Sequence, residues 1–403
     1  MICKEVNNGL DVVKSVKTSA ASAHLTKKDK DVGLIYSGTN CVAAAVFTNN
    51  KVPAAPVIYD KGLFEESKCF RAIIVNSGNA NACNSNGFEA INNITKELSK
   101  KLNIKQQEIF VASTGIIGED LPYNNIVNSI DELIDSLANG NSESLSRSMM
   151  TTDTFEKNAA VECSFLGTKF NIGAVAKGAG MIHPNMATML SFITTDINID
   201  QNMLSKALRY AVSRSFNRIS VDGDMSTNDT VLIFSTQEAK NEKIKEDNEL
   251  YRFFLDKLIH ICTKLAKDIV KDGEGSTKLV EIVVVGAQAR QDAKNVAENV
   301  ANSLLVKTAM FGNDPNWGRI VDAIGYSKGH ILADKLEVFL GNYKVFSKGK
   351  GVNPENKAKI VKYMKNSKEL KILIDLDVGI ERYNMWFSDL SYDYIKINAE
   401  YHT

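Results

Sequence analysis

The chain has 403 residues, with 48 lysines and arginines against 48 acidic residues and a 44% share of hydrophobic side chains. That length predicts two or three folding units with a sizeable core, and the apolar share argues against disorder. A net charge of zero offers no basic excess for nucleic acid, and no apolar run approaches the roughly 18 residues that cross a bilayer. We therefore expect a soluble protein that binds neither nucleic acid nor membrane.

The first residues contain no apolar signal-peptide core, so we expect the protein in the cytoplasm. Its cysteines show no CxxC pair and no Cys/His cluster, which predicts reduced, mostly buried thiols. They are Cys3, Cys41, Cys69, Cys83, Cys163 and Cys262. The segment 222–233 starts like a calcium loop but has Thr227 where glycine is required and Ile233 where a bidentate glutamate is required. We predict no metal site.

The first third of the chain alternates short strands with helices. Two apolar runs bounded by turn residues, 71–75 and 109–112, indicate buried strands. Apolar residues at three- and four-residue spacing predict helices over 91–102 and 126–137.

The middle of the chain continues this mixture. Asp200 is placed to cap a helix whose apolar face covers 204–216. A longer helix is predicted over 250–270, followed by a strand over 279–285 and a helix over 293–304.

Toward the C-terminus the period changes to two. The segment 336–346 folds back at Gly341-Asn342, and 370–378 alternates strictly, so we predict antiparallel sheet here. The charged stretch 238–249 is expected to be a surface connection or a helix start rather than a linker between domains. Strands and helices in both halves predict a layered α/β or α+β fold.

Five stretches of small and polar residues interrupt the periodic pattern. Each alone is more often an ordinary turn, but five in one chain favour a small-molecule site built from several loops. They cover 76–81, 113–118, 177–180, 272–278 and 311–319. In the third, Lys177 precedes its glycines, so the stretch lacks the order of a phosphate-binding P-loop.

One threonine stands out as a candidate nucleophile. Thr188 follows a glycine stretch and a proline, and it lies among small and apolar residues. A threonine hydroxyl needs an adjacent base, and one solution is to cut the Ala187–Thr188 bond so that the freed α-amine, with a pKa of about 7.7, accepts the proton. The more ordinary interpretation is a threonine that leads into a strand.

The segment KGAGMIHPNMATML (177–190) closely resembles the processing site of the ornithine acetyltransferase family of arginine biosynthesis. Further segments resemble the family in the same order, so the similarity covers nearly the whole chain. They are VNSGNANAC (75–83), STGIIGE (113–119), TTDT (151–154), DGDMSTNDT (222–230), DGEGSTK (272–278), GNDPNWGRI (312–320) and DYIKINAEYHT (393–403).

The resemblance implies a precursor that cleaves itself between Ala187 and Thr188. The products would be an α chain, 1–187, with the oxyanion-hole and substrate loops, and a β chain, 188–403, with the nucleophile and a C-terminal tail that closes the site. Thr188 would take acetyl from N-acetylornithine and pass it to glutamate in a ping-pong scheme. The implied fold is a layered sandwich of mixed sheets covered by helices, as in N-terminal-nucleophile enzymes, and the implied assembly is a heterotetramer of two α and two β chains.

The resemblance also assigns roles to individual residues. Thr114 and Gly115 match the pair that stabilises the oxyanion. Substrate-binding roles fall on Thr151, Lys177, Thr188, Glu274, Asn398 and Thr403, although the match within 151–154 leaves the threonine open. Our hypothesis is that Lys177 meets the substrate carboxylate and Glu274 its ammonium group.

Taken alone, these residues have ordinary explanations. Lys177 would be a surface lysine, Glu274 a solvated loop acid, and Asn398 and Thr403 frayed terminal residues. The resemblance instead predicts that the last five residues are ordered. His402 departs from the small hydroxyl or basic residue common in the family at this position, which puts the local contacts of the tail in doubt.

Other readings stay open. A self-processing amidohydrolase or aminopeptidase of similar fold would use the same nucleophile and pass the acyl group to water. A non-catalytic amino-acid-binding protein would remain one uncut chain. No cofactor is predicted, and no residue decides whether acetyl-CoA serves as a co-substrate, as it does in some members of the family.

Overall fold

A computed structural model describes residues 2–183 and 189–400. The chain forms two compact units, each described by itself below. The larger unit comprises Met1–Gly178, Asn185–Asn217 and Met225–Ile269, and the smaller unit comprises Ala179–Pro184, Arg218–Asp224 and Val270–Thr403. The charged stretch 238–249 lies inside the larger unit and leads into a helix, which confirms that it is not a linker between domains.

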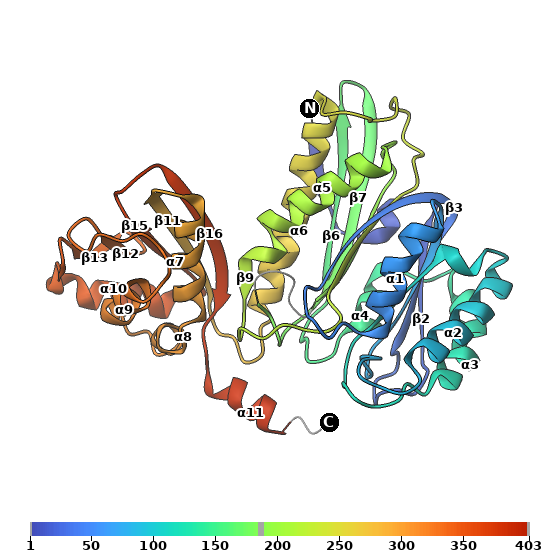
Figure 1. The fold of residues 1–403 in the computed structure, drawn as a ribbon, viewed down its shortest axis with the longest axis horizontal. Coiled ribbons are helices and arrows are strands. Elements are labelled where there is room, and N and C mark those ends of the chain that lie inside the picture. The colour runs from blue at the N-terminus through green and yellow to red at the C-terminus, as the bar shows by residue number, and fades with distance from the viewer. Residues whose placement is uncertain (1, 184–188, 401–403) are drawn as a thin grey trace. The chain divides into compact units, whose positions relative to one another are not determined.

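The larger unit contains a mixed nine-stranded sheet, counted over the described residues (Figure 1). Eight strands follow one another in the order β1 (Ile2–Val6), β6 (Lys157–Phe165), β7 (Thr168–Lys177), β8 (Leu190–Thr195), β10 (Thr230–Ser235), β3 (Val32–Phe47), β4 (Phe70–Asn76) and β5 (Ile109–Ser113). The ninth, β2 (Val16–Ala21), pairs with β3. The β8–β10 and β4–β5 pairs are parallel and the others antiparallel.

The long strand β3 is shared by two halves of this sheet. Its first part, 32–36, pairs with β2 and β4, and its last part, 42–47, pairs with β10, with a register shift between Tyr36 and Cys41. Apolar side chains from both halves form one core cluster, in which Phe70 and Phe110 stack at 4.6 Å between ring centroids. The predicted layered sandwich of mixed sheets is therefore confirmed.

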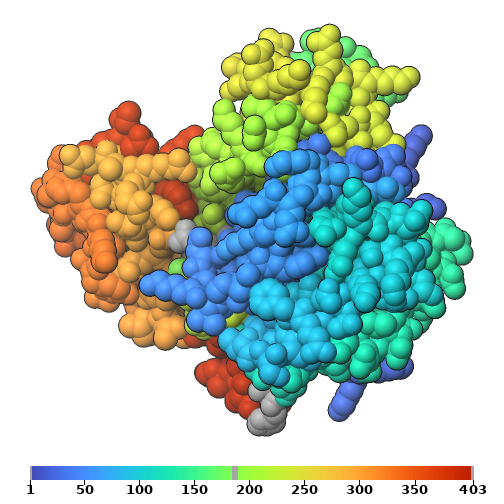
Figure 2. All heavy atoms as spheres, turned by 45° about the vertical axis from the view of Figure 1, so that its right-hand side comes forward, coloured from blue at the N-terminus to red at the C-terminus, as the bar shows by residue number. Residues whose placement is uncertain are grey.

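Helices cover the sheet of the larger unit. They are α1 (Ala55–Glu66), α2 (Gly87–Leu102), α3 (Tyr123–Ser136), α4 (Ser142–Met149), α5 (Gln201–Arg214) and α6 (Glu249–Lys271). The apolar faces of α2 and α3 bury a second cluster against β4 and β5, and Figure 2 shows the outer side of this layer in light blue to teal. Asp200 caps α5 as predicted, because its side chain accepts the Asn202 N–H at 2.8 Å.

The smaller unit contains a seven-stranded sheet within the described residues. Its order is β14 (Lys350–Gly351), β13 (Tyr343–Ser347), β12 (Glu337–Leu340), β15 (Glu369–Asp375), β11 (Leu279–Ala287), β16 (Glu381–Ser388) and β9 (Ile219–Ser220). Its helices are α7 (Arg290–Asn302), α8 (Leu304–Phe311), α9 (Trp317–Gly325), α10 (Lys357–Asn366) and α11 (Tyr392–Glu400). Short 3₁₀ helices of the chain cover Leu10–Val12, Gln106–Glu108, Phe216–Arg218 and Pro354–Asn356.

One sequence prediction in this unit needed correction and one was incomplete. The hairpin at Gly341-Asn342 is confirmed, and β12 pairs antiparallel with both β13 and β15 as predicted, but β15 also pairs in parallel with β11 on its other side. Alternation reports that one face is buried, not the direction of the neighbour, and the helices between β11 and β15 supply the crossover that a parallel pair needs. The helix predicted over 293–304 ends at Asn302, because Ser303 caps a separate helix by accepting the Val306 N–H.

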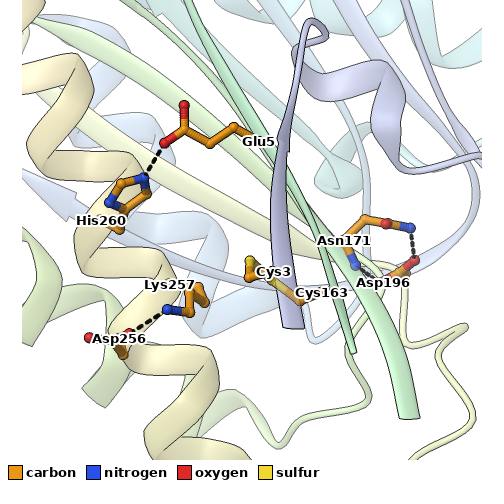
Figure 3. The surroundings of a disulfide bond; sticks show 8 residues. All are labelled: Cys3, Glu5, Cys163, Asn171, Asp196, Asp256, Lys257 and His260. Carbon is orange, nitrogen blue, oxygen red and sulfur yellow. Dashed lines mark hydrogen bonds and ion pairs between the residues drawn. A yellow bond between two sulfur atoms is a disulfide. The ribbon is translucent and has the colours of Figure 1, made fainter. Parts of the chain in front are cut away.

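The prediction that every cysteine is reduced is also wrong. Cys3 on β1 lies directly opposite Cys163 on β6, and the two form a disulfide (Figure 3). Residues 160 positions apart can meet only through this ladder, which the sequence pattern did not reveal. Burial raises the pKa of the free thiols Cys41 and Cys262 to about 12. No helix among the described residues has the length and apolar character needed to cross a bilayer.

Candidate functional site

Lys177, the last residue of β7, is the centre of a buried polar cluster in the larger unit. Only 2% of its surface is exposed. Its ammonium Nζ donates to Thr151 Oγ1 at 2.7 Å and to Thr114 Oγ1 at 3.2 Å. An ammonium group only donates, so both threonine oxygens accept from it and their hydroxyl protons are directed elsewhere. Three predicted site residues are thus brought together, and within 151–154 the Thr151 hydroxyl contacts Lys177.

A buried carboxylate, Asp153, holds this cluster in place. Its Oδ1 accepts the Gly178 N–H at 2.6 Å and Lys157 Nζ at 2.8 Å, and its Oδ2 accepts the Thr151 N–H at 3.0 Å. Burial alone would raise the pKa of Asp153, but the ammonium groups of Lys177 and Lys157 outweigh that effect and hold it well below its usual range. Sequence reasoning missed Asp153, since nothing in its spacing distinguishes a buried ion-pair partner from a loop acid.

Thr114 and Gly115 follow β5 in a tight turn that leaves no room for a side chain at position 115. Gly115 has φ +134°, and a Cβ on it would lie 2.3 Å from the backbone carbon of Gly78. The Thr114 N–H donates to Asn76 O at 3.0 Å, and the Ile116 N–H donates to Gly78 O at 3.3 Å. Two of the loops singled out in the sequence, 76–81 and 113–118, are therefore joined by backbone hydrogen bonds. This places the Thr114 hydroxyl at a rigid turn.

In the smaller unit, Glu274 and Asn398 also come together. Asn398 Nδ2, on α11, donates to Glu274 Oε2 at 2.7 Å, and the Glu274 N–H donates to Ala179 O at 2.9 Å. Gly180 permits this arrangement, because a Cβ there would lie 2.4 Å from Glu274 Oε1. The carboxylate thus lies against the backbone of the segment that leads toward the predicted cleavage site.

The loop 272–278 anchors the C-terminal tail of the smaller unit. Asp389 accepts the Thr277 and Lys278 N–H groups, and Ser391 Oγ donates to Gly275 O at 2.6 Å. On the other side, the buried Lys307 on α8 donates to Ser388 O at 2.7 Å. Burial lowers the pKa of Lys307 to about 7. The tail is held here before α11 begins.

The surroundings of Glu274 are acidic. Burial raises the pKa of Tyr394, and the carboxylates of Asp222, Glu274 and Asp224 raise it further. Such a concentration of negative charge suits a bound ammonium group. No group of three or more possible metal ligands occurs in the part of the chain that the structure describes.

Several predicted positions lie outside the described residues. These are Ala187 and Thr188 at the predicted cleavage site, and Thr403 and His402 in the tail. The last five residues were predicted to be ordered. Residues 399 and 400 belong to α11, and 401–403 lie outside the described residues. The loop 311–319 is a turn between helices, where Asn316 caps α9 by accepting the Arg319 N–H at 3.2 Å.

Comparison with known proteins identifies the family of the chain. Residues 17–403 match the model of the ArgJ family. The arginine biosynthesis bifunctional protein ArgJ of Oceanobacillus iheyensis is 44% identical over 94% of this chain and 92% of its own length. The glutamate N-acetyltransferase of Methanocaldococcus jannaschii is also 44% identical, over 92% of this chain and 94% of its own.

Among solved structures, the chain resembles the arginine biosynthesis bifunctional protein ArgJ of Bacillus halodurans. The identity is 41% and the TM-score 0.52, and the match covers 53% of this chain and 100% of that one. The family model matches nearly the full length of the chain, and the Oceanobacillus and Methanocaldococcus relatives are 44% identical to it. The chain belongs to the ArgJ family and is an acyltransferase.

Proposed function

We propose that the enzyme transfers acetyl from N2-acetyl-L-ornithine to L-glutamate, giving ornithine and N-acetylglutamate in arginine biosynthesis. The Thr188 hydroxyl attacks the acetyl carbonyl, ornithine leaves with a proton, and the acetyl ester on Thr188 is then attacked by the glutamate amine. The observation that carries the proposal is the buried cluster of Lys177, Thr114 and Thr151, which offers hydroxyl donors at a rigid turn.

The oxyanion of each tetrahedral intermediate needs donors placed in advance. Thr114 Oγ1 accepts from Lys177 Nζ, so its hydroxyl proton is available to an alkoxide, and the nearby ammonium strengthens it as a donor. The Gly115 N–H in the same turn is the second donor of this proposal. Loss of one such donor typically costs about 10²- to 10³-fold in kcat.

The substrate carries charges that the remaining residues match. N-acetylornithine has an α-carboxylate and a side-chain ammonium group. Lys177 and the Thr151 hydroxyl bind the carboxylate, and Glu274 binds the ammonium group. Asn398 donates to Glu274 Oε2 and so orients the carboxylate for this contact.

Self-cleavage precedes transfer in this proposal. The Thr188 hydroxyl attacks the Ala187 carbonyl, the acyl group shifts from nitrogen to oxygen, and water hydrolyses the ester to release Ala187 and a free Thr188 amine. That amine then serves as the base. The solved Bacillus halodurans chain supports a cut, because 53% of this chain matches its whole length, and 188–403 makes up just over half of the residues.

Intact-mass analysis tests the cut. Purified protein should give two fragments, 1–187 and 188–403, and Thr188→Ala should stay whole. Thr188→Ser, which keeps a hydroxyl, is the matched control and should still cleave. A wild-type chain that stays whole after long incubation removes the nucleophile and the mechanism.

Partial reactions test the transfer. Incubation with N-acetylornithine alone should add the mass of one acetyl group to the fragment that begins with Thr188, and glutamate should remove it. If the acetyl group is lost as fast without glutamate as with it, water is the acceptor and the enzyme is a hydrolase. Replacing N-acetylornithine with acetyl-CoA decides whether it is a second donor. No cofactor is proposed.

We extend the proposal to a cytoplasmic heterotetramer of two α and two β chains, as the family resemblance implies. Light scattering of the native protein should give twice the mass of the 403-residue chain. A mass equal to one chain would contradict the assembly.

A further inference from the structure

The segment Ser226–Thr230 of the larger unit contacts both the oxyanion loop and the residue that follows Thr188. It belongs to the DGDMSTNDT sequence, to which the proposed function gives no role. Its residues lie at the start of β10, beside β8, and are buried throughout. Two neighbouring side chains in it, Asn228 and Asp229, face different parts of the candidate site.

Asn228 binds the oxyanion loop, by which we mean 113–118 together with the loop 76–81 to which it is hydrogen-bonded. Its Nδ2 donates to Ser113 O at 2.9 Å and to Ala80 O at 2.6 Å, so both amide protons are used. The Ser113 carbonyl belongs to the peptide group that carries the Thr114 N–H. Since Thr114 also donates to Asn76 O, that peptide is held at both its oxygen and its nitrogen.

Asp229 binds the strand that begins after the nucleophile. Its Oδ1 accepts the N–H of Met189, the residue next to Thr188 in the chain, at 3.0 Å. The Met189 carbonyl in turn accepts the Thr230 N–H at 3.2 Å. Met189 is therefore held on both sides by the 229–230 backbone and side chain.

Stability alone does not explain Asp229. The side chain is fully buried, and its second oxygen, Oδ2, accepts no hydrogen bond of normal distance and angle among the described residues. Burial raises the pKa of Asp229 well above its usual range, although the Met189 N–H and the Thr48 hydroxyl act in the opposite direction. A buried carboxyl with one oxygen that lacks a normal hydrogen bond costs folding free energy, so its presence calls for another reason.

We propose that Asn228 and Asp229 are positioning residues that set the geometry between the oxyanion donors at Thr114 and the nucleophile at position 188. Consecutive residues share one peptide group, so a single rigid link holds the Ser113–Thr114 peptide group on one side and Met189, the residue next to the nucleophile, on the other. The inference rests on the proposed function. A misplacement of about 1 Å at a reacting centre can cost about 10²-fold in rate.

Asn228→Ala and Asp229→Ala test the proposal. Each should lower kcat for acetyl transfer, expressed per cleaved molecule, by about 10²-fold, and should slow self-cleavage to a similar degree. The KM for N-acetylornithine should stay within a few-fold, because neither side chain is proposed to touch substrate. Asp229→Asn keeps an oxygen to accept the Met189 N–H and should restore both rates to within a few-fold of wild type.

Asn241→Ala is the matched control. Asn241 is also buried, and its Nδ2 donates to two carbonyls, Asn198 O at 2.8 Å and Glu242 O at 2.7 Å. These carbonyls follow the C-terminal ends of β8 and β10, whereas Asn228 and Asp229 precede the first residue of β10. It should leave kcat unchanged. Wild-type kcat in Asn228→Ala, or an equal loss in Asn241→Ala, overturns the proposal.

The Asp229 pair decides the matter if Asn228→Ala fails to fold. Equal loss in Asp229→Asn and Asp229→Ala overturns the positioning role, because the asparagine preserves the hydrogen bond. If the wild-type enzyme itself neither cleaves nor transfers, the proposed function fails first, and that outcome is distinct from any of these.

Discussion

Replacing Asp153 with asparagine should destabilise the larger unit strongly. The change keeps the shape of the side chain and removes the charge that the ammonium groups of Lys157 and Lys177 both face, at 2.8 Å and 3.8 Å. All three side chains are at most 2% exposed. Water therefore cannot replace the lost carboxylate without opening the cluster.

The size of the effect follows from this burial. Removing one partner of a buried ion pair typically costs about 3 to 5 kcal/mol. The loss also has a ceiling: at pH 7 a lysine with an ordinary pKa of about 10.4 can give up its proton at a cost of about 5 kcal/mol. We expect a loss of about 3 to 5 kcal/mol, a large part of the roughly 5 to 15 kcal/mol that stabilises a typical domain.

Urea unfolding at pH 7 measures this loss. The experiment uses the Thr188→Ala background, so that every sample is a single uncut chain. Circular dichroism reports the whole protein, whereas tryptophan fluorescence reports the smaller unit, because Trp317 and Trp386 both lie there. Asp247→Asn is the control, since it removes the same charge from an exposed ion pair with Arg252 and should cost less than about 1 kcal/mol.

The pH dependence provides a second check. The pKa of Asp153 is held well below its ordinary value of about 3.9, so the stability that its charge contributes is fully present above that pH and is lost as the pH falls toward the folded pKa. The destabilisation of Asp153→Asn relative to wild type should therefore be constant near pH 7 and shrink as the pH falls below about 4. A loss below about 1 kcal/mol at pH 7, or a loss that persists unchanged at acid pH, would refute this account of the cluster.

Four further outcomes are expected. Gly180→Ala should displace only the flexible end of Glu274, so the KM for N-acetylornithine should rise about tenfold or more while the melting temperature changes little; an unchanged KM contradicts this. Gly115→Ala meets backbone at positive φ and should cost about 1 to 3 kcal/mol and abolish self-cleavage; normal processing in mass spectra speaks against the turn as described. Lys307 has a folded pKa of about 7, so the wild-type free energy of unfolding should rise by a few kcal/mol from pH 7 to 10, whereas Lys307→Met should lack this rise; equal slopes in urea titrations would exclude it. Thiol titration of denatured, unreduced protein should find four thiols, and a count of six would contradict the β1–β6 disulfide.

Elements with a strong local signal could be predicted from the sequence. The cap at Asp200, the long helix that became α6 and the turn at Gly341-Asn342 all depend on residues close in the chain. The β6–β7 hairpin was missed, although Leu166 and Gly167 both have positive φ at its turn. Its strands contain four alanines against four β-branched side chains, together with lysines and asparagines, so their β-propensity is weak.

The candidate site depends on contacts that no spacing reveals. Lys177 taken alone would be a surface lysine, and its burial follows from Asp153, which the chain brings to the end of β7 from 24 positions earlier. Family resemblance located Lys177, Thr114 and Thr151, because it compares whole segments rather than periods. Neither approach singled out Asp153, Asn228 or Asp229, which act by holding other residues.

A cut after Ala187 would leave the two products bound within one sheet. β7, before the cut, is hydrogen-bonded to β8, after it, over six residue pairs from Ile172–Thr195 to Lys177–Leu190. β10, after the cut, is likewise paired with β3. Once denaturant has separated the products, they must meet again before either can complete its strands. Refolding of the cleaved enzyme would then depend on protein concentration, as for an obligate dimer, whereas the Thr188→Ala chain would refold as a single molecule.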